Sequence, residues 1–516
     1  MDNSNNLARM IPTEVRAFFI LSLLLLTGCS GMQTRLTAPE DITATTCRDL
    51  FQKVNTAIDN TAVRDYGSSS IKEFPYLRTT RLLASFNHEL RSESSPWKAW
   101  IGHMADLDAQ ARAFELRNLP ISVTNRQNEI LLNYLNRCRE LLIAVDLTEL
   151  EHRTLLRDIT HVPDDYVGWW QALGLYPLTA PIVAVGISAW HRRTHDIFAM
   201  PLTSLPVKGK MIRWAPTSTS FPATTGDLLP HKPMSTQQIS KILYQSRDSL
   251  GIPLPTATEL NQLFETFAPI WEVDVVDEND HIGMVFWEEN KPSVDITRPT
   301  LYRKVSHTRF GNLVLLQLNY VVWFPARPGN DIYAGQLDGI NWRVTLGPDG
   351  EPWLYDTIHN CGCYHQFFPS RHLQLRKGLP SAYFEFPLLP QLAPEQQPLV
   401  LRIAHHTHFI QRVYHDKEIN DSPPGAGIQT RQPMLWKNYD ELRSLPSYNE
   451  YLSLFGKYGL VTGTERAERF LLWPMGIRSP GAMRQWGRHP TAFNGRRHFD
   501  DAFLIESLFE RAHKIQ

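Results

Sequence analysis

The sequence predicts an α+β protein, with a helical N-terminal domain, a largely antiparallel β domain and a mixed C-terminal segment. Three observations support this class. Apolar residues recur at helical spacing in the first third of the chain, they alternate with polar residues from about residue 266, and turn sequences separate the alternating segments. With 42% hydrophobic residues among 516, the composition is that of a globular chain.

Residues 46–200 are predicted to form the helical domain. Within them, Leu131, Leu135 and Leu142 follow one another at intervals of four and seven residues, which places them on one face of a helix. Such a face needs a partner to cover it. We therefore expect several helices packed against one another in this region.

The nearly uncharged stretch 173–190 is long enough that a membrane-spanning helix must be considered. Pro177 and Pro181 would interrupt its hydrogen bonds. Buried turns and short helices are therefore predicted here. The neighbouring Trp169 and Trp170 keep a second possibility open, a surface that dips into a membrane, because tryptophan favours the membrane–water interface.

Residues 201–261, rich in Pro, Ser and Thr, are predicted to be a connector. The β-rich domain is predicted over 262–418, and its clearest hairpin has the turn 347–350 after the alternating segment 340–346. Residues 419–516 form the mixed segment. Strands at Trp271–Val275 and Ile282–Phe286 are predicted to pair across a turn at Glu278-Asn279-Asp280. Further strands are predicted at Leu313–Phe324 and Leu399–Val413, and helices near Tyr439–Leu445 and Asp501–Ala512.

The N-terminus has the pattern of a secretory signal. Arg9 and Arg16 precede an apolar run, Ala17–Leu26, which is shorter than the about 20 residues that span a bilayer. The run ends in Leu26-Thr27-Gly28-Cys29, which resembles the lipobox of bacterial lipoproteins. The resemblance covers only about the first 30 residues. The alternatives are an ordinary cleaved signal and a short membrane anchor.

The resemblance implies a signal peptide over 1–28, cleavage before Cys29 and lipid on its thiol and new amino terminus. Residues 29–45 would then be a tether, and two or more acyl chains make anchoring stable. Ser30 stands where lipoproteins retained at the inner membrane usually have Asp. A periplasm-facing, lipid-anchored position on the outer membrane is therefore expected.

Charge and cysteine usage narrow the partners further. The net charge of −1 gives no support to a nucleic-acid partner. Besides Cys29 the chain has Cys47, Cys138, Cys361 and Cys363, and an oxidising compartment requires thiols to be paired, buried or metal-bound. A bridge between Cys361 and Cys363 would close a very tight ring. Cys47 and Cys138, both in helical segments, are thus the preferred disulfide, although spacing alone does not fix the pairing.

The stretch from Asp356 to His365 carries the densest group of reactive side chains. His359, Cys361, Cys363 and His365 occupy alternate positions, and Asn360 and Gly362 between them are turn residues. A tight turn could bring the four together as ligands of a transition metal such as zinc. More histidines follow close by, and two of them, His406 and His408, are expected to face one site from a neighbouring strand.

Three interpretations of this group remain open. The first is the metal site with ligands His359, Cys361, Cys363 and His365. The second is a thiol nucleophile, Cys361 or Cys363, activated by a histidine that Asp356 orients. The third is structural: buried cysteines and hydrogen-bonded histidines at the end of a sheet.

Three further groups are weaker candidates. A basic cluster could bind anionic envelope components or pair with Asp500, Asp501 and Glu506, and the second is preferred. It consists of Arg478, Arg484, Arg488, His489, Arg496, Arg497 and His498. Ser306-His307-Thr308-Arg309 precedes a long strand, and Asp164-Asp165 suits either a cation or a helix cap.

No Gly-rich phosphate loop, Gly-x-Ser-x-Gly elbow or His-Glu-x-x-His metal helix is present. The sequence therefore predicts a membrane-anchored envelope lipoprotein that binds a transition metal through its His/Cys group. The alternatives are a non-catalytic envelope scaffold or assembly lipoprotein that binds envelope proteins, and a thiol-dependent hydrolase or acyltransferase.

Overall fold

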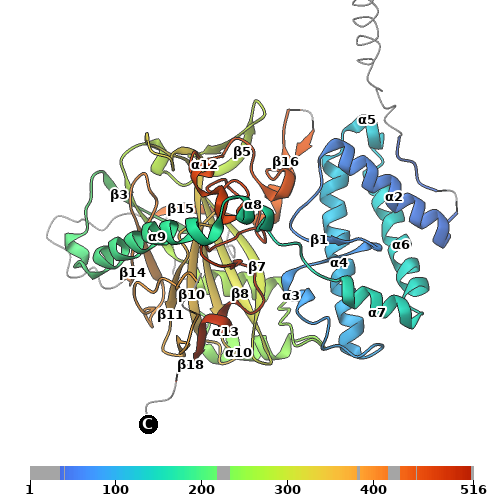
Figure 1. Cartoon of the computed structure of the whole chain (residues 1–516), viewed down its shortest axis with the longest axis horizontal. Coiled ribbons are helices and arrows are strands. Elements are labelled where there is room, and N and C mark those ends of the chain that lie inside the picture. Colours follow the sequence, from blue (N-terminus) through green and yellow to red (C-terminus); the bar gives the residue numbers. More distant parts are fainter. Residues whose placement is uncertain are drawn as a thin grey trace, which may run out of the picture.

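The computed structural model describes residues 35–39, 41–217, 233–380, 384–416, 431–448 and 450–512. It confirms the α+β class, with helices gathered in the N-terminal part and a large mixed sheet after them (Figure 1). The expected signal peptide, Cys29 and residues 30–34 and 40 of the expected tether lie outside the described residues. Among the described residues, no helix combines the length and apolar character needed to cross a bilayer.

The N-terminal helices enclose a core of their own, which includes Phe51, Trp100 and Leu135. A disulfide joins Cys47 to Cys138, the pair preferred from the sequence, with a Cα–Cα distance of 5.2 Å. The elements are α2 (Ala44–Thr61), β1 (Ser69–Ile71), β2 (Phe74–Thr79), α3 (Arg81–Ala84), α4 (Ser95–Asn118), α5 (Ile121–Thr124), α6 (Asn128–Asp146) and α7 (Leu150–Ile159).

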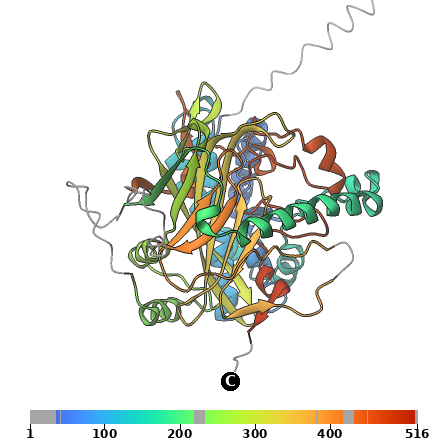
Figure 2. The same cartoon turned by 90° about the vertical axis from the view of Figure 1, so that its left-hand side faces the viewer.

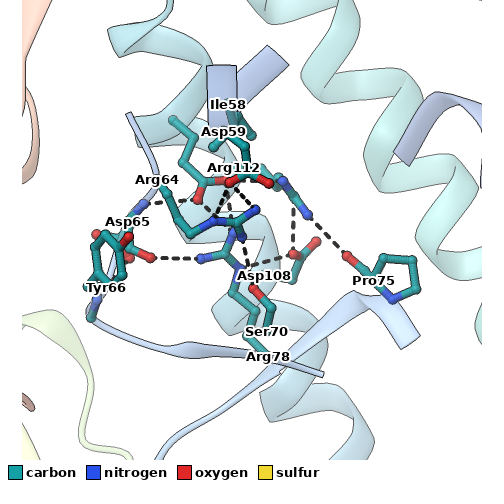
Figure 3. A network of polar contacts seen from close by, with 12 residues as sticks. Ile58, Asp59, Arg64, Asp65, Tyr66, Ser70, Pro75, Arg78, Asp108 and Arg112 are labelled. Carbon is teal, nitrogen blue, oxygen red and sulfur yellow. Dashed lines mark hydrogen bonds and ion pairs between the residues drawn. The ribbon is translucent and has the colours of Figure 1, made fainter. Parts of the chain in front are cut away.

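A buried network of charges crosses this domain (Figure 3). Arg78, which is fully buried on β2, donates to both carboxylate oxygens of Glu115 at 2.7 and 2.9 Å and pairs with Asp108 at 3.3 Å. Such charges tolerate burial only when each has a partner. The network continues into the C-terminal segment, because Arg443 donates to Asp65 at 3.0 and 2.9 Å. The two parts of the chain are thus held together by buried ion pairs.

The stretch from Gly168 to Ala199 differs from the prediction of buried turns and short helices. It forms α8 (Gly168–Leu173) and a single long helix, α9 (Tyr176–Ala199), much of which is exposed. Pro177 lies in the first turn, where its missing N–H has no helical partner to lose. Pro181 removes one further bond, and the helix continues through it. Figure 2 shows α9 extending beyond the sheet, beside α12 (Arg469–Leu472).

Ten strands within the described residues form one mixed sheet, in the order β11-β10-β9-β8-β7-β15-β3-β4-β13-β14. The half from β11 to β7 is antiparallel throughout, as predicted, and β15 joins it to the other half through parallel pairs. The strands are β3 (Lys210–Pro216), β4 (Ile270–Val275), β7 (Thr300–Phe310), β8 (Leu313–Arg327), β9 (Gly335–Leu346), β10 (Pro352–His359), β11 (Gln366–Pro369), β13 (Leu399–Ile403), β14 (Ile410–His415) and β15 (Gln432–Asn438).

The predicted connector 201–261 is more structured than its composition indicated. It contributes β3 to the sheet, α10 (Thr236–Gln245) and the beginning of α11 (Ala257–Phe267). Ser235 and Thr256 begin these helices with capping boxes, and Ile239, Leu243 and Leu263 face the core of the sheet. Two of the polar residues that suggested a connector, Ser235 and Thr256, are therefore helix caps.

Local patterns predicted some pairings and missed others. The β9–β10 hairpin forms as expected around residues 347–350. Two other expectations fail. The segment 282–286 does not pair with β4, because η2 (Glu278–Asp280) intervenes and β5 (Met284–Glu288) pairs with β6 (Lys291–Asp295). The single strand expected over 399–413 is a hairpin, β13–β14.

The C-terminal segment is mixed, as predicted, and covers one end of the sheet with short elements and loops. The region expected to be helical near 439–445 is a 3-10 helix, and the one over 501–512 forms a single helical turn followed by a strand. The remaining elements are η1 (Leu202–Ser204), β12 (Leu373–Leu375), η4 (Tyr439–Arg443), β16 (Leu445–Pro446), β17 (Tyr451–Leu452), η5 (Lys457–Gly459), η6 (Trp473–Met475), α13 (Leu504–Leu508) and β18 (Phe509–Arg511).

Candidate functional site

The reactive group predicted from the sequence lies in a tight turn between β10 and β11. The N–H of Gly362 donates to the carbonyl of His359 at 2.7 Å, and the N–H of His359 donates to the carbonyl of Cys363 at 3.0 Å. Gly362 has φ 96°, and a Cβ there would lie 2.8 Å from the carbonyl oxygen of Pro490. Glycine is therefore required both for the left-handed backbone and for the close contact.

The turn does not gather the four predicted metal ligands. His365 Nε2 lies 2.9 Å from Asp356, whose carboxylate also accepts two bonds from Arg343. His359 Nδ1 instead lies 3.3 Å from Asp338. No three ligand atoms of His359, His365 and the two cysteines lie within 4.8 Å of one another. The two histidines are held by separate carboxylates because β10 and β11 present them to different neighbours.

Cys361 and Cys363 do come together, and both are free thiols. The pKa of the Cys363 thiol is raised well above its ordinary value by a hydrogen bond with Cys361, by burial and by the nearby Glu468. A neutral thiol is a weak nucleophile. Asp356, the residue expected to orient a catalytic histidine, is fully buried with Arg343 and His365. The geometry thus supplies two neighbouring thiols, one of which, Cys363, has a raised pKa, and no activating base hydrogen-bonded to them.

A cavity of about 580 Å³ opens beside the two cysteines. One wall is the apolar side of α9, with Val183, Ile187 and Trp190. The Trp190 ring also contacts the ring of Tyr364, with 5.4 Å between centroids, so α9 is packed directly against the turn. A cavity of this size with an apolar wall is typical of a site for a small amphipathic molecule.

The rest of the cavity wall carries charges of both signs. Arg327 contacts the faces of Tyr333, Tyr364 and Phe409 and donates to the hydroxyl of Tyr364 at 3.2 Å. Glu468 faces the same space, and burial raises its pKa to about 7. The cavity therefore combines apolar surface with a fixed cation and a carboxyl group that titrates near neutrality.

Glu468 reaches this position because Gly481 lacks a side chain. A Cβ on Gly481, which has φ 80°, would lie 2.1 Å from Glu468 Oε1. Sequence reasoning missed Glu468, Arg327 and the α9 wall of the cavity. No spacing links these three segments in the chain, and the uncharged stretch 173–190 was the only signal that an unusual surface was present.

Behind the turn, a line of buried ionisable groups leads away from the cavity. Asp338 accepts from His359 and, at 2.8 Å, from Nδ1 of His408, and these two histidines hold its pKa well below the ordinary range. Burial alone would lower the pKa of His408, but Asp280 and Asp338 together raise it. Burial lowers the pKa of His359. Asp338 thus lies between two buried histidines whose pKa values are shifted in opposite directions, upward for His408 and downward for His359.

The predicted common site of His406 and His408 is not formed. Both residues have positive φ and lie in the loop between β13 and β14, where strand parity does not apply. His406 turns outward to Asp277, at 3.2 Å, whereas His408 is buried against Phe324. Among the described residues, only Asp277, Asp280 and His406 bring three ligand atoms within 4.8 Å of one another. Asp280 already accepts from the N–H groups of Val276 and His406, so its oxygens are largely occupied.

The basic cluster is mostly a structural device. Arg484 is 2% exposed and donates to the carbonyl of Cys361 at 3.0 Å. Asp164, rather than the predicted Asp500, Asp501 or Glu506, pairs with Arg496 at 2.6 Å and His498 at 3.3 Å. The Oδ1 atom of Asp164 also accepts a hydrogen bond from the N–H of Tyr166, so Asp164 closes a local turn.

The Ser306–Arg309 segment lies within β7, and its side chains are engaged in packing contacts. His307 Nε2 lies 2.8 Å from the carbonyl oxygen of Pro253, and Arg309 pairs with Glu89 at 2.8 Å.

Comparison of the chain with family models, curated proteins and solved structures gives no match. The function is therefore argued from the cavity and its side chains.

Proposed function

We propose that this protein is a lipid-anchored lipoprotein of the bacterial envelope, facing the periplasm from the outer membrane, and that the cavity beside Cys361 and Cys363 binds an amphipathic envelope molecule. The lipobox-like Leu26–Cys29 supports the anchor. The disulfide between Cys47 and Cys138 is in keeping with an oxidising compartment.

The observation that carries the binding function is the cavity of about 580 Å³, with its apolar α9 wall and its charged opposite wall. Val183, Ile187 and Trp190 suit the apolar part of a ligand, and Arg327 and Glu468 suit a head group that bears a phosphate and an amine. Binding of this kind requires no thiolate. The raised pKa of Cys363 therefore favours binding over nucleophilic catalysis, because catalysis would need the thiolate.

A second candidate is the metal function, now limited to two ligands. The adjacent sulfurs of Cys361 and Cys363 suit a soft transition-metal ion, which would displace both thiol protons. Metal analysis of protein purified without an affinity tag tests it. The wild type is expected to hold about one equivalent of metal and a Cys361→Ser/Cys363→Ser variant none, and equal contents would rule this function out.

The anchor is tested by mass spectrometry of the N-terminal peptide from protein extracted from membranes of the natural host. We expect the chain to begin at Cys29 and to carry a diacylglyceryl group and an acylated amino terminus. A chain that begins at Met1, or an unmodified Cys29, would refute this part of the proposal.

The cavity is tested by the rate at which N-ethylmaleimide modifies Cys363, with and without lysophosphatidylethanolamine below its micellar concentration. A lipid in the cavity covers the thiol, so we expect it to slow the modification at least tenfold. A Tyr448→Cys variant is the control, because residue 448 is 96% exposed and not among the residues that line the cavity. Equal slowing at both thiols, or at neither, would contradict the proposed binding.

A further inference from the structure

Large apolar side chains gather on one exposed surface of α8, α9 and α12. We call this surface the apolar face. Each of its members is between 64% and 73% exposed, whereas side chains of this kind are usually buried in a soluble domain. The members are Trp169, Leu178, Ile182, Val185, Phe470 and Leu471.

The three helices all lie against η6 (Trp473–Met475). The N–H of Val167, at the start of α8, donates to the carbonyl of Gly476 at 2.7 Å, and Gln171 donates to that of Met475 at 3.1 Å. Gly174 lies against Pro474, close enough that a Cβ there would lie 2.4 Å from its side chain. The close fit holds α8 against η6, which directly follows α12 (Figure 1).

The charges around the apolar face are arranged for an anionic partner. No Asp, Glu, Lys or Arg occurs from Gly168 to Trp190. Cations stand at its border: Arg478 lies over the ring of Trp170 and Arg469 over that of Phe470, and α9 continues into the exposed Arg192. Tryptophan and leucine surrounded by arginine are the composition of surfaces that lie at the boundary between lipid head groups and acyl chains.

The same helix, α9, also forms a wall of the cavity. Leu178, Ile182 and Val185 recur at i, i+4 and i+7 on the apolar face, and Val183, Ile187 and Trp190 recur at the same spacing in the cavity wall. Corresponding members of the two rows are five residues apart, which is about 140° around a helix with 3.6 residues per turn. One side of α9 is therefore part of the apolar face, and the other side forms a wall of the cavity.

We propose that the apolar face lies on the bilayer, as a second membrane contact besides the N-terminal lipid, and that the cavity, on the other side of α9, receives its ligand from this bilayer. The ligand would then be an acyl-bearing phospholipid or lysophospholipid. This inference rests on the proposed membrane-side location and on the proposed binding function. A bilayer fits the apolar face better than a second copy of the chain, because the bordering arginines of two copies would face one another.

The test uses full-length acylated protein reconstituted into vesicles of phosphatidylethanolamine and phosphatidylglycerol with doxyl-labelled acyl chains. A Cys361→Ser/Cys363→Ser background leaves one reactive thiol, introduced as Ile182→Cys on the apolar face or as Tyr448→Cys in the control, and labelled with the fluorophore NBD. We expect at least twofold quenching by the doxyl groups and a blue-shifted emission at residue 182. Neither change is expected at residue 448.

Equal quenching at residues 182 and 448 would overturn the proposal. A blue-shifted emission at residue 182 without quenching by the doxyl lipids, which is lost when the protein is diluted, would also overturn it. That result would indicate that a second copy of the chain covers the apolar face. Adding Leu178→Glu and Val185→Glu to the Ile182→Cys protein is expected to halve the quenching, and an unchanged value would also count against it. Both positions are exposed, so folding should be preserved. Sedimentation with vesicles reports the acyl anchor separately, because an anchored protein sediments whether or not the apolar face is in contact.

Discussion

Replacing Glu468 with glutamine is expected to remove a pH dependence of stability that the cavity imposes on the folded protein. Burial raises the pKa of this carboxyl from its ordinary 4.5 to about 7. Between these two pH values the folded state binds a proton that the unfolded chain has released. The free energy of unfolding therefore falls as pH rises through this window.

The size of the effect follows from the two pKa values. One pH unit corresponds to about 1.4 kcal/mol, so the change from 4.5 to about 7 costs the wild type about 3 kcal/mol by the upper end of the window. Glutamine is neutral throughout and cannot lose this contribution. Relative to the wild type, Glu468→Gln should gain about 3 kcal/mol in free energy of unfolding between pH of about 4 and about 8.

Urea unfolding followed by tryptophan fluorescence at several pH values measures this difference, in which contributions from other groups cancel. Glu465→Gln is the matched control, because it removes an exposed carboxylate three residues earlier in the chain. Its difference from the wild type should not change with pH. If the Glu468→Gln difference is equally constant, then the carboxyl is not held protonated by burial and the description of the cavity is wrong.

The other predictions concern the N-terminal domain and its attachment. Cys47→Ala/Cys138→Ala removes a disulfide with a sequence separation of 91, so loop entropy predicts a loss of up to about 4.5 kcal/mol in the free energy of unfolding. The thermal midpoint of the helical domain should fall by roughly 10 °C. Melting curves that coincide with those of the wild type would contradict this. Arg443→Met leaves the buried carboxylate of Asp65 without its charged partner, and it should lower the free energy of unfolding in urea by about 3–5 kcal/mol. Lys437→Met, which removes an exposed ion pair, should cost less than about 1 kcal/mol, and similar losses in both variants would refute the importance of burial.

The sequence by itself was sufficient for features that depend on neighbouring residues. Helical spacing predicted the helix that contains Leu131 and Leu135, and alternation with a Gly-Pro-Asp-Gly turn predicted the β9–β10 hairpin. The sequence also indicated that Cys361 and Cys363 lie close together, because they are only two residues apart in the chain. Local periodicity reports which face of an element is buried, and this information is present in a short window.

Only the tertiary structure decided which distant side chains meet. His359 is hydrogen-bonded to Asp338, so the predicted set of metal ligands does not assemble. Glu468 lies near Cys363, although it is more than a hundred residues later in the chain. Pro177 was compatible with α9 because it lies in the first turn, and the helix continues through Pro181 despite the hydrogen bond lost there. Periodicity carries no information about which elements pack together. The cavity and the apolar face are therefore set by long-range packing of the sheet, α9 and the C-terminal segment.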